Sequence, residues 1–462
     1  MPFRVLAIAL SLFGSTAVWG HASSQQLVLL LPTDVYNTVG VAIVTLTVLF
    51  LAVPALANRL TRFSHGRLLA FDATGARYAV SLASFALLAV ALVAGLTGSR
   101  DPLTNPLPLL IWSVWWVILV VINGLLGNLW RWLNPWSGMV ALLTQAFDMR
   151  PVLTYPTRLG HLPALAGFLL FSAFLLAHPA PDDPAVLASV VALYWLVTLI
   201  AMLLFGEPAW RTHGEFASVL MTQFSHSALL GSRARALHIG LPGWQLSHRR
   251  DTSLSLAVFV LLLLGTSSFD GFNETFFWLG LLGVNPLEFP GRSAVIPQTL
   301  AGIAIGNALL IVLFSVCVVS GLALARARLP FLHVFASLAP TLLPIAVGYH
   351  FAHYLTTILV TSQYTLASLN DPFASGWRLL GFDTFYVTTG FFNTPDSVAR
   401  IFFAQATAVV LGHVVSLLSA HRVMASLLED NRKTVLSQLP LAAFMVAYTL
   451  FGLWLLSAPR GA

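Results

Sequence analysis

Charged residues are scarce in this 462-residue chain, where Asp, Glu, Lys and Arg together make up 9% of the positions. A soluble domain carries about 25% charged residues. So few charges do not cover the surface of a soluble fold of this length. Apolar residues make up 58% of the chain, and a bilayer accepts them because the solvent around membrane-spanning helices is itself apolar. The composition indicates an integral membrane protein.

Cysteine and lysine are almost missing, since Cys317 is the only cysteine and Lys433 the only lysine. One cysteine excludes an intramolecular disulfide, and any metal site must use His, Asp, Glu or backbone ligands. The formal charge of +6 is carried almost entirely by arginine, and no basic run on a polar segment is interleaved with aromatic residues. We therefore expect no nucleic-acid partner, because the cytoplasmic loops of membrane proteins account for the basic residues.

The first twenty residues have the pattern of an export signal. Arg4 precedes an apolar stretch, residues 5–13, that is too short to span a bilayer, and the small residues Val18 and Gly20 fit a signal-peptidase site. We expect residues 1–20 to be a cleaved signal peptide and 21–462 a single transmembrane domain; an uncleaved first span is the alternative. Cleavage would leave His21 with a free amine and a ring nitrogen, a pair that suits copper.

Ten hydrophobic stretches follow the signal, and their long apolar runs do not alternate as barrel strands do. Helices satisfy their backbone hydrogen bonds internally in lipid. We therefore expect an all-α polytopic transmembrane helix bundle of about ten spans, with the lipid bilayer as its main partner. The expected spans are 36–57, 78–98, 107–126, 162–177 (a short one), 185–205, 253–269, 299–325, 338–361, 399–420 and 438–457.

The basic residues indicate the orientation of these spans. With the mature N-terminus outside, seventeen Lys and Arg residues fall in cytoplasmic loops and five on the outer side. This bias follows the positive-inside rule. We expect a multi-pass protein of the bacterial inner membrane with both mature termini outside. The long loops 270–298 and 362–398 then face outward, and long loops are often functional.

Histidines within the spans are the first candidates for function, because an ionisable residue in a membrane span is costly. His350 and His353 lie one helical turn apart, and His413 lies in the following span. Counting residues from the outer helix ends places His350 and His413 at similar depth. We expect these three histidines to bind a divalent transition metal, since neutral imidazole suits zinc, copper and iron. Hydrogen bonding between helices, haem binding and a proton relay are the alternatives.

Two carboxylates are candidates for the catalytic part of such a site. Asp270 stands in TSSFDGF at the outer end of the sixth span, and Asp371 stands in NDPF just after the eighth. Asp270 is the first choice to complete the site, as a fourth metal ligand or a general base, and Asp371 is the second choice. Three protein ligands with one open position are typical of a catalytic metal.

The chain resembles the bacterial integral-membrane family labelled fenitrothion hydrolase over nearly everything after the signal. The resemblance implies a hydrolase that cleaves an organophosphorus triester, a small apolar substrate, and releases a nitrophenol. The family pattern includes His353, His413 and His421. The segments that carry the resemblance are LLGNLWRWLNPW, FGEPAWRTHGEFASV, SSFDGF, LLPIAVGYHFAHY, NDPFASGWRLLG, GHVVSLLSAHR and SQLPLAAFMVAYTLFGLWLLS.

These observations leave three functions open. The first is a metal-dependent hydrolase of organophosphorus triesters, in which the metal lowers the pKa of a bound water. The second is a transporter or metal-handling permease, because buried histidines suit a translocation path. The third is a b-type haem protein with His350 or His353 facing His413.

The expected topology has a direct test. Alkaline phosphatase fused after Gly381 is expected to be active, because that loop faces outward, and the enzyme fused after Arg249 is expected to be inactive. Activity from each fusion in cells measures the side on which it lies. The opposite pair of activities would put the acidic loops in the cytoplasm.

Overall fold

A computed structural model describes residues 31–70, 74–233, 236–247, 253–383 and 386–460; the expected signal peptide and His21 lie outside these residues. Within these ranges, nine helices are long and apolar enough to cross a membrane, and Leu162–Ala177 is a shorter apolar helix. These ten helices coincide with the ten expected spans. The prediction of an all-α polytopic membrane bundle is confirmed.

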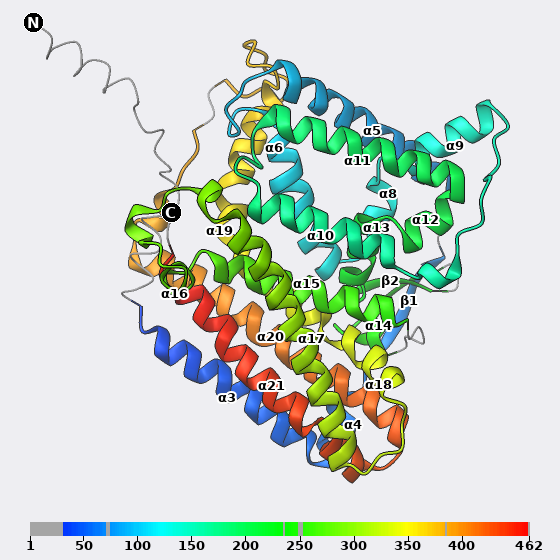
Figure 1. The fold of residues 1–462 in the computed structure, drawn as a ribbon, viewed down its shortest axis with the longest axis vertical. Coiled ribbons are helices and arrows are strands. Elements are labelled where there is room, and N and C mark those ends of the chain that lie inside the picture. Colours follow the sequence, from blue (N-terminus) through cyan, green and yellow to red (C-terminus); the bar gives the residue numbers. More distant parts are fainter. Residues whose placement is uncertain (1–30, 71–73, 234–235, 248–252, 384–385, 461–462) are drawn as a thin grey trace, which may run out of the picture.

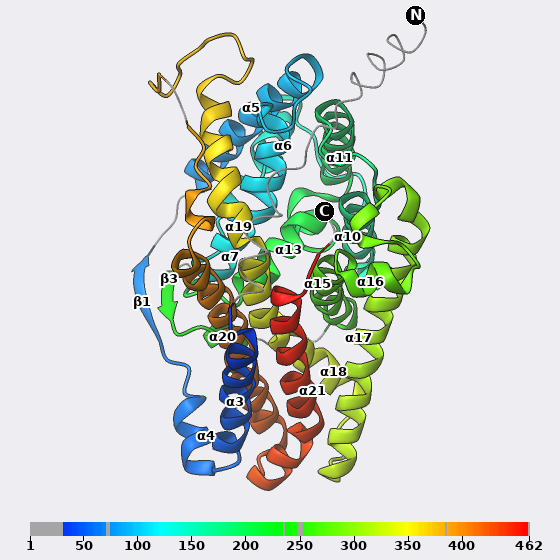
Figure 2. The same cartoon turned by 90° about the vertical axis from the view of Figure 1, so that its left-hand side faces the viewer.

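The helices form two groups that lie side by side in two perpendicular views (Figures 1 and 2). The first group holds the two longest helices, α17 and α20, and α20 packs along α21. Both α20 and α21 contact α3. The second group joins two apolar helices, α5 and α11, to shorter helices. The first group consists of α3 (Thr33–Leu51), α17 (Ile296–Leu324), α20 (Pro395–Leu428) and α21 (Asn431–Ser457). The second consists of α5 (Thr74–Thr97), α6 (Pro106–Pro108), η1 (Leu109–Leu119), α7 (Val120–Leu125), α8 (Trp130–Leu133), α9 (Ser137–Ala146), α10 (Leu162–Ala177), α11 (Pro184–Phe205), α12 (Glu207–His213) and α13 (Phe216–Ser225).

Two helices connect these groups. The helix α15 (Leu254–Asn273) packs on α17 and α10, and α19 (Leu343–Asn370) packs on α20 and η1. Most of α15 is buried, with a run of core residues from Phe259 to Leu264. Any polar side chain on α15 or α19 that points toward the other helix therefore lies at the junction of the two groups.

Prolines interrupt the chain before α19. The helix α18 (Phe331–Leu338) is followed by the 3-10 segment η5 (Ala339–Leu342), which contains Pro340. Proline removes one helical hydrogen bond and its ring crowds the preceding turn. The helix α19 then continues to Asn370, nine residues beyond the expected end of that span at residue 361.

A small antiparallel sheet was not expected from the sequence. Its strands are β1 (His65–Ala70), β2 (Leu230–Arg233) and β3 (Ala236–Gly240), in the order β1-β3-β2. All three come from loops that the charge count assigns to the cytoplasm. Their pairing shows that these two loops lie on the same side of the bundle, as the expected alternation of spans requires.

The opposite side carries the loop after α15 and the end of the chain. The short helix α16 (Phe276–Leu281) begins where the backbone N–H of Phe276 donates to the Pro459 carbonyl over 2.9 Å. Arg460 lies 3.6 Å from Glu274. Segments expected to be outside are thus in contact. The remaining short elements are α4 (Pro54–Leu60), η2 (Thr157–Leu159), α14 (Trp244–Ser247), η3 (Pro286–Glu288), η4 (Arg292–Val295) and η6 (Gly390–Phe392).

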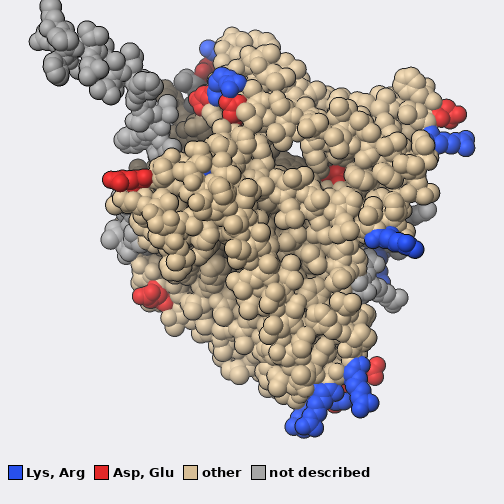
Figure 3. Space-filling model, in the orientation of Figure 1, with Lys and Arg blue, Asp and Glu red and all other residues tan. Residues whose placement is uncertain are grey.

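The surface has the distribution of a membrane protein. Figure 3 shows a face whose centre is almost free of charge, with Lys and Arg mainly along its right-hand and lower margins. Large apolar side chains on α3, α5, α11 and α17 are exposed. Such a broad uncharged belt is compatible with contact to the lipid bilayer.

The close packing of α19 on α20 depends on two glycines. A β-carbon added at Gly348 would lie 2.3 Å from the Ala408 carbonyl oxygen, and one at Gly412 would lie 2.5 Å from that of Pro344. Small residues allow membrane helices to approach this closely. This contact fixes which residues of the two helices lie at the same level.

Gly348→Ala is therefore expected to reduce the free energy of unfolding by about 1–3 kcal/mol, the usual cost of overpacking. Gly452→Ala on α21 is the matched control, because an added β-carbon there meets its nearest neighbour, Val409 Cγ1, at an ordinary 3.4 Å. Thermal unfolding in detergent measures both variants. Equal midpoints for the two variants would contradict the packing argument.

Candidate functional site

The Asp270 carboxylate is the centre of a buried polar cluster between α15 and α19. His353 Nε2 lies 3.3 Å from Asp270 Oδ2, and the Tyr354 hydroxyl donates to the same oxygen over 2.7 Å. The Trp116 indole N–H in turn donates to the Tyr354 hydroxyl over 2.9 Å. The pairing of Asp270 with His353, both expected as site residues, is thus present.

His350 belongs to the wall of this cluster. It is 2% exposed, and its Nε2 donates to the backbone carbonyl of Trp116 over 2.9 Å. Trp116 lies in η1, an eleven-residue π-helix. Turns of π-helix are uncommon in proteins, and those that occur are often found at functional sites. The His350 ring also packs edge-on against Trp116, with ring centroids 5.1 Å apart. His350 therefore ties α19 to η1.

Two buried polar atoms of the cluster have no hydrogen-bond partner, the Tyr349 hydroxyl and His353 Nδ1. A methyl group added at Gly271 would lie 2.0 Å from the Tyr349 oxygen and 3.6 Å from His353 Nδ1. The Tyr349 oxygen therefore packs directly against Gly271, and His353 Nδ1 lies beside the same residue, where α15 carries no side chain. Unpaired buried polar groups are rare, and this pair offers one donor and one acceptor to a ligand.

His413 lies at a different level from this cluster. Gly412 packs against Pro344, which lies nine residues before His353, or roughly 14 Å at the helical rise of 1.5 Å per residue. Gln405 is the α20 residue beside the cluster, because its side-chain amide donates to the Ala352 carbonyl over 2.8 Å.

The three expected metal ligands, His350, His353 and His413, are therefore not gathered. In the part of the chain that the structure describes, no group of three or more His, Cys, Asp or Glu side chains is placed to hold a metal ion. His413 Nδ1 donates to the Val409 carbonyl over 2.8 Å, and its Nε2 is buried without a partner. Its free nitrogen suits a metal, but it lies apart from the other two histidines.

Asp371 is far from the cluster. It follows the last residue of α19, eighteen residues beyond His353, or roughly 27 Å along the helix. Its carboxylate accepts the backbone N–H groups of Ser375 at 2.9 Å and Gly376 at 2.7 Å. Desolvation opposes ionisation, but the backbone hydrogen bonds together hold the pKa of Asp371 below its usual value. In this structure Asp371 organises the loop after α19.

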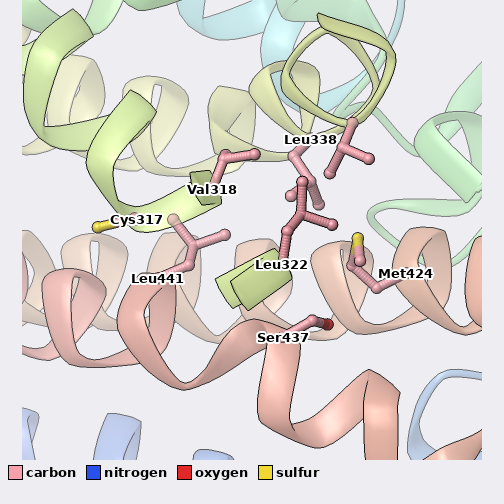
Figure 4. A pocket seen from close by; sticks show the side chains of 8 residues that line it. Cys317, Val318, Leu322, Leu338, Met424, Ser437 and Leu441 are labelled. Carbon is pink, nitrogen blue, oxygen red and sulfur yellow. The ribbon is translucent and has the colours of Figure 1, made fainter. Parts of the chain in front are cut away.

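Two apolar hollows lie among the helices of the described ranges. One, where α17, α18, α20 and α21 meet around Cys317 and Leu441, is too small to hold a water molecule (Figure 4). The other is a cavity of about 500 Å³ between α5, η1, α10, α11 and α13. None of His350, His353 and His413 lines this larger cavity.

Tyr349, Tyr354 and Trp116 belong to the site although the sequence did not predict them there. A signal for the tyrosines was present in GYHFAHY, where Tyr349 and His353 are four residues apart, as are His350 and Tyr354. Residues at this spacing share a helix face. No sequence pattern connects Trp116 with the site, because it is 238 residues from Tyr354 in the chain.

Comparison of the chain with protein-family models, with curated proteins and with solved structures finds no match. The likeness to the family labelled fenitrothion hydrolase therefore stays a prediction.

Proposed function

We propose that this protein is a membrane-embedded hydrolase of organophosphorus triesters, with His353 as general base and Asp270 as the residue that holds it. The reaction class comes from the resemblance described above. The placement of the two residues comes from the cluster between α15 and α19. Asp270 is three residues before the end of α15, and the charge count puts that end at the outer surface.

The observation that carries the proposal is the pair of unpartnered atoms beside Gly271, the Tyr349 hydroxyl and His353 Nδ1. His353 Nε2 lies 3.3 Å from Asp270 Oδ2, and with the Nε2 proton directed to this carboxylate the lone pair of the imidazole lies on Nδ1. A general base must reach the proton that it removes, directly or through one water. A water beside Gly271 meets this condition.

The cluster supports a complete hydrolytic step. His353 Nδ1 removes a proton from water while the water oxygen forms a bond to phosphorus. The phosphorus–aryloxy bond breaks and nitrophenolate leaves, and the proton on His353 then passes to solvent or to the leaving group. Asp270 stabilises the imidazolium, and the Tyr349 hydroxyl donates to the P=O or P=S group as charge develops on it.

Of the residues expected to bind a metal ion, only His353 and Asp270 are in contact with each other, because His413 lies at another level along the helices. The proposed reaction therefore does not require a metal ion. We expect activity to survive treatment with a chelator. Loss of activity that zinc, copper or iron restores would instead favour a metal-dependent hydrolase.

The proposal predicts that His353→Ala lowers the rate of nitrophenol release from an organophosphorus triester by about 10²–10⁴-fold, the usual contribution of a general base. Asp270→Asn is expected to lower kcat as well, because the amide no longer stabilises the imidazolium. His333→Ala is the matched control, since His333 is an exposed histidine of α18. Absorbance of released nitrophenolate, followed with purified protein in detergent, measures each rate.

Equal rates in the wild type and His353→Ala would overturn the assignment of the base. No hydrolysis by the wild type, together with uptake of a metal or solute into proteoliposomes, would favour the transporter. A Soret band in the purified protein would favour the haem protein.

A further inference from the structure

The large cavity opens onto the apolar surface of the bundle. Its walls include Leu170 of α10, which is 72% exposed, and Leu193 of α11, which is 64% exposed. Its floor includes fully buried side chains such as Leu187 and Ala217. Figure 3 shows an opening in the surface on the side of the molecule where α10 and α11 lie in Figure 1. The cavity therefore reaches from the lipid-facing surface into the second group of helices.

The lining offers almost no hydrogen bonds to a ligand. No charged residue lines the cavity. The Tyr194 hydroxyl already donates to Glu215, and the Trp136 indole donates to the Trp195 carbonyl over 2.9 Å. The indoles of Trp112, Trp130 and Trp195 are also hydrogen-bonded within the protein. Apart from the Trp115 indole, the lining thus offers a ligand an apolar surface, which favours a hydrocarbon group.

The size of the cavity limits the occupant further. A volume of about 500 Å³ lies within the roughly 300–1,000 Å³ of ordinary ligand pockets. A helix with side chains is about 10–12 Å across and needs more room than this. A flexible hydrocarbon chain that enters sideways from the bilayer meets both the size and the chemistry of the walls.

A cluster of arginines lies next to one end of the cavity. Glu207 accepts a hydrogen bond from Arg211 Nε over 2.7 Å and lies 3.6 Å from Arg77. Ser137, which follows the lining residue Trp136, donates to the same Glu207 oxygen over 2.6 Å. Arg77 is seven residues before the lining residue Ser84 on α5, so the two share a helix face about 10 Å apart.

This cluster has more positive than negative charge. Arg131 forms none of the ion pairs found in the described ranges, and Arg77 Nε is buried without a partner. Burial, together with the charges of Arg77 and Arg211, lowers the pKa of Arg131. Arg77 and Arg211 thus share the Glu207 carboxylate, while Arg131 has no acidic partner among the described ion pairs. An anion placed near these three guanidinium groups would be stabilised.

We propose that the cavity binds a hydrocarbon chain of an anionic phospholipid, whose phosphate is held by Arg77, Arg131 and Arg211. The apolar chain occupies the space between α5, α10 and α11. The phosphate lies at the side of the membrane that carries most of the basic loops. This binding site is separate from the Asp270 cluster and does not depend on the proposed hydrolysis.

Native mass spectrometry of the full chain in detergent tests the proposal. We expect wild-type protein to retain one phosphatidylglycerol with sixteen-carbon chains more tightly than phosphatidylcholine with the same chains. Dihexanoyl phosphatidylglycerol and inorganic phosphate supply the anionic group without the long chain, and we expect both to bind far more weakly. Equal binding of phosphatidylglycerol and phosphatidylcholine would overturn the assignment of the phosphate to the arginines.

Variants separate the two parts of the site. Val190→Trp, which adds a large side chain to the lining, is expected to weaken phosphatidylglycerol binding at least tenfold, and Leu193→Trp provides a second such variant. Leu196→Trp on α11 is the matched control, because Leu196 is exposed and does not line the cavity. Wild-type binding by both lining variants would overturn the cavity assignment.

Arg131→Gln is expected to reduce the preference for phosphatidylglycerol over phosphatidylcholine about fivefold, the usual contribution of one basic residue near an anionic lipid. Arg150→Gln, which removes an exposed arginine outside the cluster, is expected to leave the preference unchanged. An unchanged preference in Arg131→Gln would remove this residue from the phosphate site.

Discussion

Asp270 accepts hydrogen bonds from two neighbouring side chains of α19, His353 and Tyr354, and the arrangement of the site depends on this contact. In an interior of low dielectric such bonds are strong, and a partner left unpaired is costly. Tyr354 extends the contact to the Trp116 indole of η1. One carboxylate thus fixes α15 against α19, and through Tyr354 it also connects both helices to the second group.

This constraint determines which atoms remain free for chemistry. Because His353 Nε2 is in contact with Asp270, the other ring nitrogen, Nδ1, lies on the side of Gly271. The Tyr349 hydroxyl also lies beside Gly271. Both groups are held in position before any ligand arrives, which is the condition for efficient electrostatic stabilisation of a transition state. The Trp116 ring, which packs on Phe171 with centroids 4.8 Å apart, separates this place from the apolar cavity that Phe171 lines. The polar cluster and the hydrocarbon site therefore share a wall.

The sequence predicted the bundle and its alternation of loops because hydrophobic length and arginine distribution are local signals. It also predicted Asp270 and His353 as site residues. It placed His413 beside His350 by counting from helix ends, and counting from the observed ends, Asn370 and Pro395, still gives similar depths of 20 and 18 residues, so a count from helix ends does not reveal the level. The close contact of the two helices at Gly348 and Gly412, which a count of residues does not reveal, places Gln405 and not His413 at the level of the Asp270 cluster. The small sheet was missed for a similar reason, since strands more than 160 residues apart pair in it.

The measurement that tests the central claim most directly is the hydrolytic rate of Gly271→Ala. Its methyl group would lie 2.0 Å from the Tyr349 hydroxyl, which must then move, and 3.6 Å from His353 Nδ1. The account therefore predicts that kcat falls to the level of a variant without the base while the protein stays folded by circular dichroism. Gly280→Ala on α16 is the matched control, because an added β-carbon there meets nothing within 4 Å. Wild-type kcat in folded Gly271→Ala would contradict the claim that the reaction takes place beside Gly271.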